Sequence, residues 1–148
     1  MRHPLRRADL PHADITDRIL AGFFETYSEL GHGFSEQVLC RALAIVLRAA
    51  GLSVLEEAQL DVWFRGQCIG EFRADLIVNR TILIEVKGMA EIKSHAEAQL
   101  LNYLKGSRRR VGLLLNFGHH PRFKRMVIGN PIDSLPLLRN EDGAQPNV

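Results

Sequence analysis

The sequence predicts one globular domain of the α/β (α+β) class, with the order helix, helix, three strands, helix, strand and a weaker last strand. Apolar residues recur at helical spacing up to residue 50. Extended apolar runs separated by short polar turns follow. A further helix, with a start and a stop signal, then precedes the most apolar run of the chain.

The first two elements are predicted to be helices. A stripe of apolar side chains over residues 15–27 follows Asp14, a residue type that caps helices, and ends at Gly31-His32-Gly33. A second helix is predicted over residues 34–50. It is apolar on almost every side over residues 42–47, so we expect it to be covered on more than one side.

Three strands are predicted next. The extended pattern starts at Ser53 with apolar runs at residues 54–55 and 60–64, and further runs follow over residues 69–78 and 82–86. Their connections are too short for the crossover that parallel strands require, which predicts an antiparallel meander. Ser94 and Glu97 have the spacing of a capping box and open a helix that ends at Gly106. The run over residues 111–116 is typical of a strand buried on both faces, and a weaker strand is predicted over residues 123–128.

Composition bounds the function without identifying it. The 148 residues are 46% hydrophobic and 24% charged, and 19 basic against 17 acidic residues give a net charge of +2. That excess is too small to indicate a nucleic-acid partner. A chain of this length buries about 70% of its unfolded surface, so a disulfide-stapled miniprotein is excluded. Cys40 and Cys68 lack zinc-site spacing and are expected to be reduced thiols.

No apolar run approaches the roughly 18 residues that span a bilayer, and the basic start of the chain is not followed by an apolar signal segment. We therefore expect a cytoplasmic protein without a membrane partner. The expected organisation is a basic N-terminal segment (1–13), the domain (14–128) and an irregular C-terminal tail (129–148).

The segment over residues 72–87 carries the most informative charges. Glu85 and Lys87 project from one face of their strand, about 7 Å apart. On the preceding strand Arg73 and Asp75 share one face. The apolar faces of the two strands are expected to consist of Phe72, Ala74, Leu76 and Val78, and of Ile82, Ile84 and Val86.

Register decides whether these charges meet. Pairing of Val78 with Ile82 across a three-residue loop places Asp75 opposite Glu85, and Arg73 opposite Lys87. A two-residue turn would turn Asp75 away from Glu85. We expect the three-residue loop, which brings the two carboxylates about 5 Å apart, close enough to share a divalent cation. Mg²⁺ suits such a pair, because it takes one or two carboxylates together with water and substrate phosphate.

These residues resemble the GxxExxxR proteins within the PD-(D/E)XK nuclease superfamily. The similarity rests on residues 30–36 (LGHGFSE), 73–78 (RADLIV), 84–87 (IEVK), 98–105 (AQLLNYLK) and 111–117 (VGLLLNF). It implies a restriction-endonuclease-like αβββαβ core with a mixed central sheet flanked by helices. It also implies that Mg²⁺, or Mn²⁺ in its place, is bound by Asp75 and Glu85.

The same resemblance implies that Lys87 positions or activates water, that Glu36 reaches in from the flanking helix, and that Gln99 matches a further site position. One position departs from the pattern: its arginine falls at Cys40, with Arg41 next along the chain. An i,i+4 partner for Glu36 is therefore missing.

Simpler interpretations stay open for several of these residues. The charges of Asp75, Glu85 and Lys87 could form a surface ion network worth under about 1 kcal/mol per pair. Glu36 is expected in the first turn of a helix, where the helix dipole stabilises a carboxylate by about 0.3–1 kcal/mol without any role in a site. His95, Gln99 and Tyr103 form a polar stripe, and a solvated helix face competes as an explanation for His95 and Tyr103. His119-His120 lack a third partner at metal-ligand spacing.

Basic residues flank the apolar run over residues 111–116 and are candidates for contacts with a phosphate backbone. The candidate nucleic-acid-binding residues are Arg73, Tyr103, Arg108, Arg109, Arg110, Arg122 and Lys124. For any single basic residue of the clusters beside that run, a solvated turn is the better explanation.

Two hypotheses follow. The first is a Mg²⁺-dependent nuclease-like enzyme that hydrolyses phosphodiester bonds of nucleic acid, with DNA as the favoured substrate. The alternative is a non-catalytic module that binds nucleic acid or protein on the same scaffold. The domain carries no evident recognition element, so specificity must come from its loops, its basic turns, a homodimer or a protein partner.

Overall fold

A computed structural model describes residues 11–129 of the chain. The expected N-terminal segment up to residue 10 and the expected tail from residue 130 lie outside the described residues. The helices are α1 (Ala13–Leu30), α2 (Glu36–Ala49) and α3 (Ser94–Ser107). The strands are β1 (Val54–Phe64), β2 (Gln67–Val78), β3 (Ile82–Lys87), β4 (Val111–Phe117) and β5 (Pro121–Val127).

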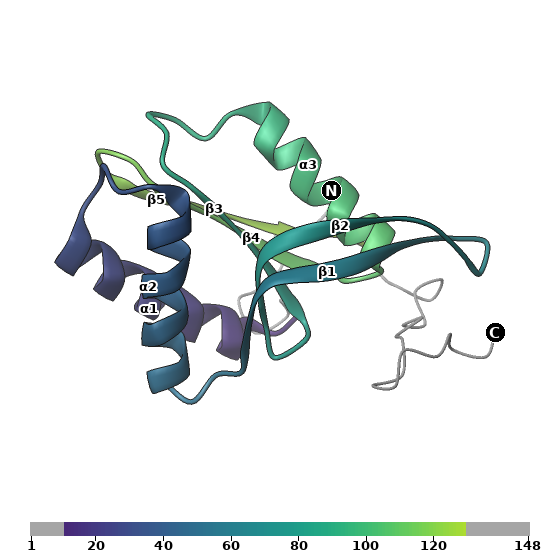
Figure 1. The fold of residues 1–148 in the computed structure, drawn as a ribbon, viewed down its shortest axis with the longest axis horizontal. Coiled ribbons are helices and arrows are strands. Elements are labelled where there is room, and N and C mark those ends of the chain that lie inside the picture. The colour runs from purple at the N-terminus through teal and green to yellow at the C-terminus, as the bar shows by residue number, and fades with distance from the viewer. Residues whose placement is uncertain (1–10, 130–148) are drawn as a thin grey trace, which may run out of the picture.

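The strands form one mixed sheet in the order β1-β2-β3-β4-β5 (Figure 1). The first three strands form the expected antiparallel meander, and β5 is antiparallel to β4. β3 and β4 are parallel, and α3 makes the crossover between them. Every residue of β4 is buried, which confirms the predicted strand with two covered faces.

Helices cover both faces of the sheet. The larger core packs α1 and α2 against β3 and β4, with Phe23, Leu43, Ile84 and Phe117 among its buried side chains. The smaller core packs α3 against the other face through Leu100, Leu104, Leu83 and Leu114. The predicted α+β fold with a mixed, helix-flanked sheet is confirmed. Among residues 11–129, no helix combines the length and the apolar character needed to cross a membrane.

Two predicted helix starts were wrong. α1 begins one residue before Asp14, and His12 occupies its cap position without a side-chain hydrogen bond. Ser94 is already inside α3, whose cap position is Lys93, so the expected capping box does not form. Glu97 instead accepts an ion-paired hydrogen bond of 2.8 Å from Lys124 on β5.

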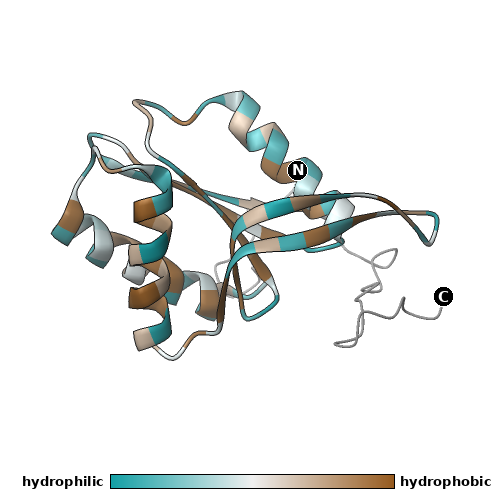
Figure 2. Ribbon diagram, viewed as in Figure 1, coloured by the Kyte–Doolittle hydropathy of each residue, from teal (hydrophilic) through white to brown (hydrophobic). Residues whose placement is uncertain are grey.

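α2 is covered on one side only, which contradicts the prediction from its apolar composition. Figure 2 shows hydrophobic positions along the helix. Some of these residues are buried and others are exposed. Its buried residues are Leu39, Leu43, Ala44 and Leu47. Val38 and Ile45 are 46% and 64% exposed, because α1 and the sheet pack against only one face of the helix.

The apolar side chains of β2 do not form the single face predicted for residues 72–78. Leu76 and Val78 join the core beneath α1 and α2, whereas Phe72 and Ala74 pack with the core beneath α3. The change occurs beside Glu57 of β1, which has a positive φ of 48° and interrupts the pairing with β2.

Candidate functional site

β2 and β3 are paired in the expected register and then separate. Val78 lies opposite Ile82 and Leu76 opposite Ile84, which confirms the three-residue loop over residues 79–81. Counted from the loop, the last paired residue of β2 is Leu76, so the ladder stops just short of Asp75. The prediction that Arg73 lies opposite Lys87 was therefore wrong. Arg73 pairs with Gln59 on β1 and is exposed.

Two carboxylates occupy the point where the strands part. The backbone N–H of Val86 donates to Asp75 Oδ2 at 2.7 Å, and the N–H of Asp75 donates to Glu85 Oε1 at 3.4 Å. These contacts take the place of the backbone ladder that ends at Leu76. Asp75 and Glu85 are thus held against each other by the main chain of the opposite strand.

Burial and mutual charge make Glu85 an unusual acid. Glu85 is buried, with only 6% of its surface exposed. Burial, followed by the charge of Asp75, raises the pKa of Glu85 from 4.5 to about 8, while Lys87 lowers it. Hydrogen bonding between the two carboxyl groups also raises this pKa. Near neutral pH the Glu85 carboxyl is therefore largely protonated.

A cavity of about 440 Å³ opens beside Asp75. Its lining consists of Glu36, Gln37, Cys40, Arg41, Glu56, Glu57 and Asp75. Glu36 reaches this cavity because it is the first residue of α2, directly after the cap Ser35, whose side chain accepts a hydrogen bond from Val38 N. The structure thus brings Glu36 and Asp75 to one cavity from a helix and a strand.

Cys40, which takes the place of the arginine in the pattern that the sequence resembles, lies one turn along α2 from Glu36. Burial, followed by the charges of Asp75, Glu85, Glu36 and Glu56, raises the pKa of the Cys40 thiol to about 12. A neutral thiol therefore borders the carboxylates. The i,i+4 spacing from Glu36 was the sequence signal for this position, which cysteine spacing alone does not reveal.

Glu56 and Glu57 were not predicted as site residues. Glu56 forms ion pairs with Arg48 at 3.1 Å and with Arg41 at 3.6 Å, so Arg41 contributes positive charge near the position that lacks the arginine. Glu57 reaches the cavity through its positive φ, which no sequence pattern indicates.

Lys87 ends β3 and is half-buried beside Asn116 of β4. The chain just beyond it is fixed by the buried Asn116 side chain. Met89 N donates to Asn116 Oδ1 at 3.0 Å, and Asn116 Nδ2 donates to Met89 O at 2.8 Å. This two-way contact holds the end of the strand that carries Glu85 and Lys87.

Gln99 is engaged on its own helix. Its Nε2 donates to the hydroxyl of Tyr103 at 3.0 Å, and the ring of Tyr103 stacks on Phe72 with centroids 3.8 Å apart. These contacts join α3 to β2. They involve neither carboxylate of the Asp75–Glu85 pair, so a role for Gln99 at that pair stays a prediction.

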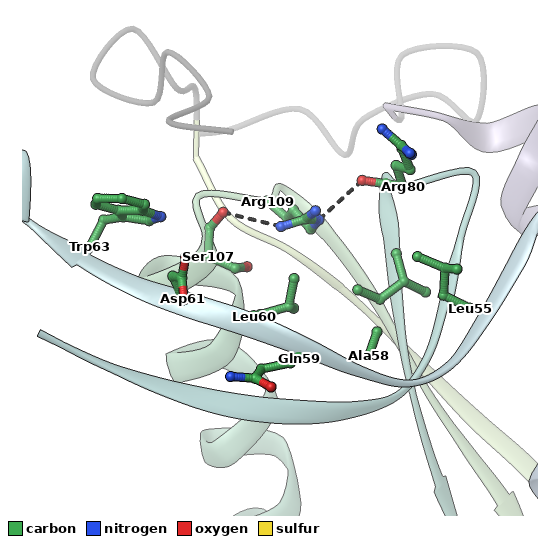
Figure 3. A pocket seen from close by; sticks show the side chains of 10 residues that line it. Leu55, Ala58, Gln59, Leu60, Asp61, Trp63, Arg80, Ser107 and Arg109 are labelled. Carbon is green, nitrogen blue, oxygen red and sulfur yellow. Dashed lines mark hydrogen bonds between the residues drawn. The ribbon is translucent and has the colours of Figure 1, made fainter. Parts of the chain in front are cut away.

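The basic candidates differ in how far they are already engaged. Arg109 donates to the carbonyl oxygens of Arg80 and Ser107 at 3.1 and 3.4 Å, beside a second cavity of about 240 Å³ (Figure 3). Burial lowers the pKa of Arg109. Lys124 is paired with Glu97, whereas Arg122 is exposed.

The two remaining arginines of the 108–110 turn lie at the end of α3. Arg108 follows the helix in the left-handed conformation, with φ of 58°. The Nε of Arg110 is buried and has no hydrogen-bond partner in the part of the chain that the structure describes. Both are half-buried rather than fully displayed to solvent.

The Asp75–Glu85 pair fits a hard divalent cation. Within residues 11–129, no group of three or more His, Cys, Asp and Glu side chains is arranged to hold a metal ion. Mg²⁺, however, is usually bound through one or two carboxylates, with water and phosphate completing its shell. The backbone contacts use Oδ2 of Asp75 and Oε1 of Glu85, and a cation would replace the proton in the hydrogen bond between the two carboxyl groups.

Comparisons with known proteins identify the family of this chain. No curated protein matched the chain. Among solved structures, the crystal structure of SSO0001 is similar, with 19% sequence identity and a TM-score of 0.47. The similarity covers 78% of this chain and 58% of that one. A model of the PD-(D/E)XK nuclease superfamily matches residues 13–126, well over half of the sequence, and the chain therefore belongs to the PD-(D/E)XK nuclease superfamily.

Proposed function

We propose that this protein is a Mg²⁺-dependent nuclease that hydrolyses phosphodiester bonds of nucleic acid, with DNA as the favoured substrate and Mn²⁺ as an alternative ion. The observation that carries the proposal is the contact of Asp75 with Glu85 where β2 leaves β3. Two carboxylates in contact are costly without a counter-charge, and a divalent cation supplies one. Membership of the nuclease superfamily supports the same conclusion.

In this proposal Asp75 and Glu85 bind the cation. The bound ion would stabilise the negative charge that develops on the phosphate and lower the pKa of water. Lys87 lies on the same strand, two residues from Glu85, and its ammonium group orients the attacking water and offsets charge on the phosphate. Asn116 keeps the end of that strand in place through Met89.

We further propose that the chain belongs to the GxxExxxR branch of the superfamily. Gly33 and Glu36 fit the pattern, and Glu36 lines the cavity beside Asp75. Cys40 replaces the arginine, and Arg41 lines the same cavity. In this interpretation Glu36 acts on the substrate side of the cavity, and substrate specificity depends on the basic turns and on a homodimer or protein partner.

The direct test is cleavage of single-stranded, duplex and branched DNA and of RNA, with Mg²⁺, Mn²⁺ or chelator. We expect metal-dependent cleavage that is lost in Glu85→Ala and Lys87→Ala. Glu71→Ala is the matched control, because Glu71 is an exposed carboxylate on the β1–β2 hairpin. Cleavage that survives Glu85→Ala would refute the assignment of the site.

Cys40 favours one second candidate, a non-catalytic module that binds nucleic acid or protein. A neutral thiol where the family pattern has an arginine removes a charge from the site. Calorimetric titration with Mg²⁺ distinguishes the two functions. If the protein is a nuclease, it should bind Mg²⁺, and Asp75→Asn should abolish that binding. If the protein binds nucleic acid but shows neither a Mg²⁺ signal nor turnover, the result favours the non-catalytic module.

A further inference from the structure

Two histidines that are far apart in the sequence meet on the surface. His32 lies in the connection between α1 and α2, and His119 lies in the turn between β4 and β5. Their ring centroids are 4.5 Å apart, with an angle of 57° between the ring planes. Both residues are exposed, so their ring nitrogens are accessible to ions from solvent.

One residue, Tyr27, fixes the backbone of both segments. Its carbonyl oxygen accepts a hydrogen bond of 2.7 Å from the N–H of Gly31, the residue before His32. Its hydroxyl donates to the carbonyl oxygens of Gly118 and His119 at 2.7 and 2.8 Å. The two imidazoles are therefore brought together by an existing network rather than by the flexibility of two loops.

We propose that His32 and His119 bind a transition-metal ion of the zinc class. Neutral imidazole is a good ligand for Zn²⁺, Cu²⁺ and Ni²⁺ and a poor one for Mg²⁺. With Zn–N distances of about 2.0–2.1 Å, the two ligating nitrogens lie a little over 3 Å apart, which rings at the observed separation reach by rotating their side chains. Water completes the coordination, since no third protein ligand converges there within residues 11–129.

The position of this pair links it to the acidic cavity. The segment that follows His32 leads through Phe34 and Ser35 to Glu36 at the start of α2. A Cβ on Gly88, the residue after Lys87, would lie 4.0 Å from the carbonyl oxygens of both Phe34 and Phe117. An ion held by His32 and His119 thus fastens the segment that borders the end of β3 and carries Glu36. The proposal does not depend on nuclease activity.

Zinc titration calorimetry on the Asp75→Asn protein tests the pair without a contribution from the carboxylate site, and excess Mg²⁺ in the buffer occupies other hard-ligand sites. We expect one Zn²⁺ per chain and a rise in melting temperature. His32→Ala and His119→Ala should each abolish both signals. His120→Ala is the matched control, because it removes a histidine from the same turn but not from the ring contact; it should retain both signals.

Two results would overturn the proposal. One is zinc binding that survives both His32→Ala and His119→Ala. The other is absence of zinc binding to the Asp75→Asn protein although circular dichroism shows it to be folded. Because the His119→Ala protein should keep its Mg²⁺ response when Asp75 is intact, failure of this site is distinguishable from failure of the proposed nuclease site.

Discussion

Glu85 is the residue where burial and charge conflict most strongly. It faces another carboxylate from a buried position on β3, and its nearest compensation comes from Lys87 and one backbone N–H. A structural acid would be expected to have a cationic partner in direct contact. The cost of holding Glu85 here is consistent with a functional role for the pair.

The raised pKa predicts how stability depends on pH. The folded protein holds a proton on Glu85 up to about pH 8, whereas the unfolded chain releases it near 4.5. The free energy of unfolding of the metal-free protein should therefore fall as pH rises through this window and level off above it. Glu85→Gln should flatten that dependence and be the more stable protein above pH 8.

Denaturant unfolding in chelator over this pH range measures the effect. Glu71→Gln, which changes an exposed carboxylate, should behave like the wild type. Identical pH profiles for Glu85→Gln and the wild type would show that the carboxyl is not protonated in the folded state.

At the residue scale, the sequence predicted the pair but not its surroundings. Alternation along β2 and β3, together with the length of the turn, was enough to place Asp75 beside Glu85. The contribution of Glu57 could not be predicted, because it depends on a positive φ at a residue that rarely adopts one. The roles of Gln99 and Glu36 in the reaction stay predictions.

Among the structural elements, β3 depends on a neighbour to hold its functional end. Asn116 of β4 satisfies both the N–H and the carbonyl oxygen of Met89. Asn116→Ala would leave these two backbone groups without their partner, at a cost of about 1–3 kcal/mol. We expect this loss in the free energy of unfolding, together with reduced Mg²⁺-dependent cleavage.

Asn102→Ala is the control, because Asn102 is an exposed amide on α3. If Asn116→Ala has the same free energy of unfolding as Asn102→Ala, water replaces the lost contacts. Unchanged cleavage despite the loss of stability would show that the end of β3 does not need Met89 to be fixed.

Elements were predicted better than their ends and faces. Apolar periodicity identified α1 and α2, and apolar runs identified the strands, because burial dominates both signals. α3 was predicted from its start and stop signals. The predicted caps were wrong at α1 and α3. The observed cap residue is His12, two residues before Asp14, at α1, and Lys93, one residue before Ser94, at α3. The exposed side of α2 was missed because hydropathy does not reveal how many neighbours a helix has.

At the scale of the whole molecule, metal should stabilise the fold. A cation that binds only the folded protein adds about 2.7 kcal/mol to the free energy of unfolding at one hundred times its dissociation constant. Thermal unfolding with increasing Mg²⁺ should show this rise, and Asp75→Asn should remove it without destabilising the metal-free protein. Unfolding of Asp75→Asn in the absence of metal would instead identify Asp75 as a structural residue.

Nucleic-acid binding should depend on only some of the basic residues. Arg122 is exposed, whereas Lys124 is paired with Glu97 and Arg109 with main-chain carbonyls. We expect Arg122→Ala to weaken binding across all sequences and to reduce the salt slope by about one phosphate contact. Fluorescence anisotropy at several salt concentrations measures it, and an Arg122→Ala slope equal to that of the wild type would exclude Arg122 from the interface.

The strands follow one another in the sheet in the same order as in the sequence. This order affects how the protein folds. Each strand lies beside its neighbour in sequence, and within residues 11–129 only the step from β3 to β4 needs a long connection. The entropy lost in closing each loop is correspondingly small, so the sheet can grow strand by strand from a hairpin. The carboxylate pair forms with the β2–β3 hairpin, early in such a sequence, whereas the cavity wall that carries Glu36 is complete only when α2 docks.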